Sequence, residues 1–152
     1  MAALKQRISD EMKAALLGGD RFRGDVLRNL KAALLNEEVA AGKRDEGLSD
    51  AEVEKVLARE VKKRLESAAL YRQNGRDELA EPEEQEAAIL QEFLPEQLSE
   101  AEVRTVVAEV VGSMGDVTVQ QMGQVIGAVK AKVGNAADGA LVAKIVKETL
   151  SS

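Results

Sequence analysis

The sequence predicts an all-α protein, and three observations support this. Apolar residues recur at intervals of three and four through most of the 152 residues, a spacing that places them on one side of a helix. Aromatic residues make up only 2% and prolines number two, whereas helix-favouring residues are abundant. Helix N-cap motifs precede several of the periodic segments. We expect an N-terminal domain of about four helices in residues 1–94 and a C-terminal three-helix module in residues 95–152.

The N-terminal domain begins with two helices separated by a pair of glycines. Apolar residues recur at helical spacing from Leu4 onwards, and Gly18-Gly19 ends this first helix. Asp20 is placed to cap the next helix, whose broad apolar stripe continues almost to Gly42. Both segments therefore predict amphipathic helices.

Two further helices complete this domain. Ser49 and Glu52 have the spacing of a capping box, and the helix that they begin should run to Asn74-Gly75 as the longest element. Because proline suits a first helical turn, Pro82 predicts a turn near residues 77–81 and a helix from about 82 to 93.

Leu94-Pro95 marks the expected domain boundary, because the residue before a proline is disfavoured in the helical region. Valine is abundant beyond it and would suit strands, but its spacing of three and four favours helices. The N-cap signals of this module are Ser99 with Glu102, Thr118 with Gln121, and Asp138.

The chain contains no histidine and no cysteine, so it lacks the commonest general base, the thiolate nucleophile and all usual metal ligands except carboxylates. Self-contained catalysis is therefore not expected, and neither is a cofactor or a metal site. The absence of cysteine fits a reducing compartment, and no segment approaches the roughly 18 apolar residues of a membrane span. We expect a cytoplasmic protein without membrane association.

The net charge is −6, and its distribution is uneven. Residues 76–100 sum to −8, whereas the rest of the chain sums to +2. We expect this acidic belt, residues 77–100, to be a solvated face, with docking to a basic protein partner as the alternative. An acidic pI near 4.9 does not exclude a local nucleic-acid surface elsewhere.

Glycines spaced four apart interrupt an apolar helical pattern in the C-terminal module. Gly123 and Gly127 share one side of the predicted helix with Lys130 and Gly134, and an interior glycine costs about 1 kcal/mol relative to alanine. The bare backbone would let a neighbouring helix approach closely, which is the interpretation that we favour. Contact between the backbone and a ligand is the alternative.

Lys130 and Lys132 precede the turn into the last helix, whose N-terminus offers free amides and partial positive charge to a phosphate. Asp138 argues against a phosphate there, because its carboxylate would cap the same amides. An ordinary capped turn with solvated lysines is therefore the competing interpretation. The candidate nucleic-acid-binding residues of this module are Lys130, Lys132, Gly134, Asn135 and Gly139.

A second basic set follows helical spacing on the third predicted helix. Its members are Lys55, Arg59, Lys62 and Lys63. We favour the interpretation that these residues pair with nearby glutamates and form a solvated face. Alternatively, they could contact phosphates and add affinity for a nucleic acid without selecting its sequence. Arg21, Arg28 and Lys31 could extend such a surface.

Segments along the whole chain carry a family resemblance. They are Leu27-Arg28, Glu60 to Arg64, Tyr71 ahead of Gly75-Arg76, Leu90 through Ser99, and Met122-Gly123 through Asp138-Gly139. In order and spacing they resemble the YqeY family. The last block is also similar to the tail domain of the B subunit of the glutamine-dependent tRNA amidotransferase, the GatB/YqeY-like three-helix module.

The resemblance implies an all-helical protein that shares its C-terminal module with a tRNA-handling subunit. In that subunit the tail is associated with tRNA binding and the catalytic domain lies elsewhere, so the family label of carbon-nitrogen ligase with glutamine as amido donor would be inherited through the module. The expected function is a tRNA-binding accessory protein, whose partner is tRNA or a tRNA-protein complex. A protein-protein interaction adaptor without RNA binding is the first alternative, and an autonomous amidotransferase is the last.

Overall fold

The computed structural model describes residues 2–151, and every regular element in them is a helix, which confirms the all-helical prediction. The chain forms two compact units, residues 1–94 and 95–152. The first unit contains α1 (Ala3–Leu17), α2 (Arg21–Ala40), α3 (Asp50–Gln73) and α4 (Asp77–Gln91). The second contains α5 (Glu100–Met114), α6 (Met122–Val133) and α7 (Gly139–Ser151), with 3-10 turns at Val119–Gln121 and Gly134–Ala136.

The predicted N-caps form their hydrogen bonds. Ser49 Oγ accepts a hydrogen bond from the Glu52 amide at 3.3 Å, and the Ser49 amide donates to the Glu52 carboxylate at 3.1 Å. Ser99 and Glu102 make the same reciprocal pair at the start of α5. Because free amides at a helix start are costly to leave unpaired, these short motifs determine where α3 and α5 begin.

The helix α4 begins earlier than predicted, so the expected turn at residues 77–81 is wrong. Gly75, at φ +70°, ends α3, and the chain enters α4 at Asp77 with Pro82 inside the helix. Carboxylates are favoured in a first helical turn, where Asp77 and Glu78 lie, because the free amides there carry partial positive charge. Proline lacks an amide hydrogen, so the helix forgoes the bond that residue 82 would donate to the Glu78 carbonyl, and the proline ring also crowds that carbonyl.

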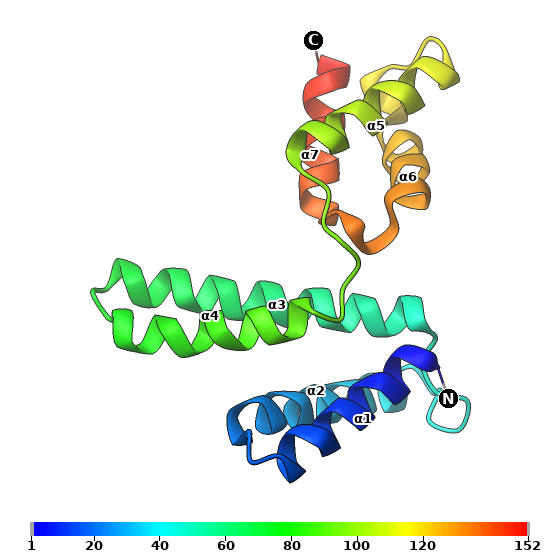
Figure 1. The fold of residues 1–152 in the computed structure, drawn as a ribbon. Coiled ribbons are helices and arrows are strands. Elements are labelled where there is room, and N and C mark those ends of the chain that lie inside the picture. Colours follow the sequence, from blue (N-terminus) through cyan, green and yellow to red (C-terminus); the bar gives the residue numbers. More distant parts are fainter. Residues whose placement is uncertain (1, 152) are drawn as a thin grey trace. The chain divides into compact units, whose positions relative to one another are not determined.

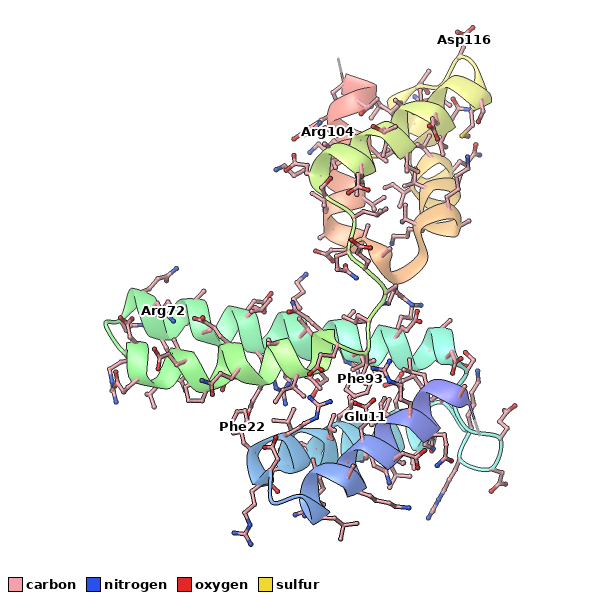
Figure 2. All side chains as sticks on the ribbon, in the orientation of Figure 1. Glu11, Phe22, Arg72, Phe93, Arg104 and Asp116 are labelled. Carbon is pink, nitrogen blue, oxygen red and sulfur yellow. The ribbon has the colours of Figure 1, made fainter. Side chains whose placement is uncertain are left out.

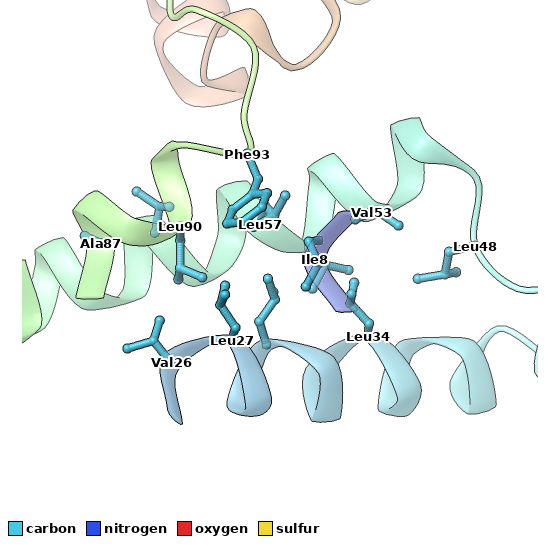
Figure 3. Packing of buried hydrophobic residues seen from close by; sticks show 13 residues of the cluster. Ile8, Val26, Leu27, Leu34, Leu48, Val53, Leu57, Ala87, Leu90 and Phe93 are labelled. Atoms are coloured by element: carbon cyan, nitrogen blue, oxygen red, sulfur yellow. The ribbon is translucent and has the colours of Figure 1, made fainter. Parts of the chain in front are cut away.

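In the N-terminal unit, the α1–α2 pair packs against the α3–α4 hairpin (Figure 1). Figure 3 shows leucines of α2 pointing toward Leu57 of α3 and toward Phe93, which follows α4. Phe93 is 3% exposed, and the guanidinium of Arg7 lies 4.7 Å from the centre of its ring. The buried cluster consists of Ile8, Val26, Leu27, Leu30, Leu34, Leu48, Val53, Val56, Leu57, Val61, Ala87, Leu90 and Phe93.

The C-terminal unit packs three short helices around a core that is almost entirely valine. The valine-rich segments are helical, as their N-caps and their spacing of three and four predicted. Its buried residues are Val103, Val107, Val110, Val125, Val129, Val133, Val142, Ile145 and Val146.

The segment before α5 is tied to the turn between α6 and α7. The Leu98 amide donates to the Ala136 carbonyl at 2.8 Å, and Gln97 Nε2 donates to the Asn135 carbonyl at 3.0 Å. These two bonds make residues 97 and 98 part of the C-terminal unit. Across residues 2–151, none of the helices has both the length and the apolar character needed to cross a membrane.

Candidate nucleic-acid interface

The glycine face of α6 is open. A Cβ built on Gly123 or Gly127 would meet no heavy atom within 4 Å beyond the backbone of its own helix, and both residues are exposed. The helices α5 and α7 pack on the other side of α6, which is rich in valine. The interpretation that Gly123 and Gly127 admit a neighbouring helix is therefore wrong. Bare backbone at this face is accessible to a ligand.

Lys130 and Lys132 lie in the last turn of α6, where the partial negative charge of the helix end favours cations. Both are exposed, and no carboxylate of residues 2–151 lies within ion-pair distance of either. A Cβ on Gly139 would lie 3.3 Å from Lys130 Nζ, so this lysine reaches across to the start of α7. The structure thus places the Lys130 side chain beside Gly139.

The N-terminus of α7 already has its own carboxylate. Asp138 Oδ1 accepts a hydrogen bond from the Ala140 amide at 3.4 Å, and the Asp138 carbonyl accepts from the Val142 amide at 3.1 Å. A phosphate at these amides would be repelled by that side chain. Any phosphate contact in this unit is therefore better placed along the open face of α6.

Gly134 and Asn135 have structural roles in the turn between α6 and α7. Gly134 adopts φ +54°, a conformation that favours glycine and ends α6. The Asn135 carbonyl accepts the hydrogen bond from Gln97. These two candidate contacts shape and anchor the turn beside the lysines.

The basic set of α3, consisting of Lys55, Arg59, Lys62 and Lys63, is exposed along the helix. Arg59 pairs with Glu37 of α2 at 3.4 Å, and Lys63 pairs with Glu60 at 3.6 Å. The Arg59 and Lys63 side chains remain 58% and 72% exposed, and ion pairs at such positions contribute little to stability. A phosphate could therefore compete for them. This set lies in the N-terminal unit and the α6 lysines lie in the C-terminal unit.

Two exposed lysines of the C-terminal unit were missed in the sequence analysis. Lys144 and Lys147 lie on α7, three residues apart, and only their spacing in an amphipathic helix marks them in the sequence. The pKa of Glu100 is lowered, mainly by its hydrogen bond from Arg104 and further by Lys144, so Lys144 already has a carboxylate nearby.

Most carboxylates of the acidic belt are paired with arginines. Arg72 at the end of the α3–α4 hairpin (Figure 2) donates to Glu84 at 2.6 Å and lowers the pKa of that carboxyl. Arg64 holds Glu86 at 3.0 Å, buried more deeply between the two helices. The other pairs are Arg72 with Asp77, Arg76 with Glu78, Arg23 with Glu92, and Arg104 with Glu100. A basic partner that bound these paired carboxylates would have to displace their arginines.

Within the part of the chain that the structure describes, no group of three or more acidic residues is arranged to hold a metal ion. A model of the family described as Yqey-like protein matches residues 5–150. The chain belongs to this family. The match covers both units, so the family resemblance extends well beyond the three-helix module.

Among curated relatives of this Yqey-like chain is the Altered inheritance of mitochondria protein 41, mitochondrial, of Clavispora lusitaniae. It is 29% identical over 92 residues, which cover 60% of this chain and 52% of the relative. An uncharacterised protein of Schizosaccharomyces pombe is 32% identical over 98 residues, covering 64% of this chain and 74% of that protein. The chain thus matches about half the length of the first relative.

Proposed function

We propose that this Yqey-like protein is a tRNA-binding accessory protein that contacts RNA through the open face of α6. The observation that carries the proposal is the combination of bare backbone at Gly123 and Gly127 with two lysines that have no carboxylate partner among residues 2–151. Helix-interior glycines lower helix stability, and no neighbouring helix here requires them.

This face of α6 would allow RNA to approach the helix backbone closely. Without side chains at residues 123 and 127, a sugar-phosphate backbone can lie directly against the helix, while Lys130 and Lys132 at its end neutralise phosphates. Such contacts supply affinity and orientation without reading sequence. The α3 set would extend the same kind of contact to the N-terminal unit.

The proposed role is binding rather than chemistry. The ligase label of the family, with glutamine as amido donor, would come from the module shared with the amidotransferase tail. No histidine or cysteine is available in this chain for a nucleophilic or general-base step. The protein would therefore act beside an enzyme, on tRNA or a tRNA-protein complex.

The test is a titration of labelled bulk tRNA at several salt concentrations. Changing Lys130 and Lys132 together to Ala should weaken binding of all tRNAs alike and reduce the slope of log K against log salt by roughly 1.4 to 1.8, the value for two lost phosphate contacts. The matched control changes Lys144 and Lys147 to Ala, which removes the same charge from the same unit and should alter the slope much less.

A second variant set asks whether α3 joins the surface. Neutralising its four basic residues should lower the salt slope further if the same RNA contacts both units. Negligible binding by the wild-type protein at low salt would refute the tRNA proposal. That outcome would favour the adaptor alternative, in which the protein binds another protein and no RNA.

A further inference from the structure

A groove of about 410 Å³ lies between α1 and α2, within the N-terminal unit. Its apolar lining comes from Met12 of α1 and from Ala32 and Leu35 of α2. Leu35 is 46% exposed, and Val39, four residues further along α2, is 58% exposed. Residues 32, 35 and 39 follow helical spacing, so an apolar line continues along α2 beyond the groove.

One end of the groove is electrically neutral. Lys5 and Glu38 form an ion pair there, and the Glu38 side chain is only 3% exposed. A buried carboxylate needs such a partner, so this pair is a fixed part of the wall.

The other charged residues of the groove are both cations from α2, Arg28 and Lys31. Lys31 has no carboxylate of residues 2–151 within ion-pair distance. Arg28 reaches only Asp25, at 3.6 Å, and both of those side chains are more than 60% exposed. The groove therefore carries two positive charges that its own walls do not neutralise.

Ser9 of α1 adds a hydroxyl to the lining of the groove, and this group can hydrogen-bond to a carboxylate or amide that enters it.

We propose that this groove binds an amphipathic helix of a partner protein, with an apolar stripe that packs on Leu35 and Val39 and carboxylates that pair with Arg28 and Lys31. A cleft between two helices, lined at helical spacing, suits a third helix. From residue 28 to residue 39 the α2 surface is about 16 Å long, which matches roughly three turns of such a helix. The apolar floor favours a protein helix over a nucleic acid.

The experiment uses a designed, fluorescently labelled helical peptide of about 15 residues, with a leucine stripe flanked by glutamates, and a second peptide with lysines in place of the glutamates. The full-length protein should bind the glutamate peptide more tightly than the lysine peptide in anisotropy titrations. Leu35→Glu should weaken binding of the glutamate peptide by about tenfold or more, because it introduces a like charge into the apolar floor. Val119→Glu is the matched control, an exposed apolar residue of the other unit.

A charge swap gives the decisive result. The double variant Arg28→Glu and Lys31→Glu should bind the glutamate peptide much more weakly and the lysine peptide more tightly than the wild type does. Circular dichroism should show that the variant remains helical. Equal binding of both peptides by the wild type, or a swap variant with unchanged preference, would overturn the proposal. Displacement of the bound glutamate peptide by tRNA, abolished by the same swap, would assign the groove to nucleic acid and also overturn it.

Discussion

Glu52 combines two roles at the start of α3. Its carboxylate accepts a hydrogen bond from Lys43 at 2.8 Å, and it also accepts the Ser49 amide in the capping box. These hydrogen bonds, Lys43 first, lower its pKa from 4.5 to about 2. The capping box follows from sequence spacing alone, but the Lys43 contact depends on how the loop folds back and has no signature in the sequence.

We expect Glu52 to make α3 sensitive to acid. Because its folded pKa lies below its unfolded value, its ionised form stabilises the fold above about pH 4.5, and this contribution is lost as the pH falls toward about 2. In Glu52→Gln, chemical denaturation should show a smaller loss of stability across that interval. A wild-type Glu52 carboxyl that titrates near pH 4.5 by NMR would contradict the expectation.

Among the elements, α6 and α2 contain helical glycines in opposite surroundings. Gly127 faces open space, whereas a Cβ on Gly24 would lie 2.4 Å from Leu16 Cδ2, where α1 and α2 meet. Gly127→Ala should therefore raise the free energy of unfolding by up to about 1 kcal/mol through helix propensity. Thermal and chemical denaturation measure the change, and a lowered midpoint would indicate a packed neighbour after all.

Gly24→Ala is the matched comparison. The same substitution should lower the stability of the N-terminal unit by roughly 1 to 3 kcal/mol, because Leu16 must leave its position to admit the methyl group. A gain similar to that of Gly127→Ala would show that Leu16 moves aside at no cost.

Periodicity and caps predicted the helices and their faces, because both depend on residues close in the chain. That the face with Gly123 and Gly127 is open could not be predicted in this way. Spacing shows which residues share a face of a helix, but it does not show what packs against that face. The start of α4 was missed for a related reason. Its first turn is stabilised by the carboxylates of Asp77 and Glu78 and by Arg72 of α3, which pairs with Asp77, whereas the prediction gave more weight to Pro82.

At the scale of the whole molecule, the connection between the two units is short. Phe93 is buried in the first core, and Gln97 is bonded to the second unit. Limited digestion with a glutamate-specific protease should therefore cut after Glu96, which like Glu46 of the α2–α3 loop is exposed and outside the described helices, and cleavage after Glu96 should leave two helical fragments. Glu96→Gln should slow this cut, and first cleavage inside any of the seven helices would contradict the prediction.

The segment between Phe93 and Gln97 contains only residues 94–96, which span at most about 10 Å when extended. A tether of this length keeps each unit at a high local concentration relative to the other, in the millimolar range for short linkers. Two weak contacts, one in each unit, would then act on a single large ligand with an avidity far above either affinity. Lengthening the chain at Glu96 would weaken such bivalent binding while leaving both contact surfaces unchanged.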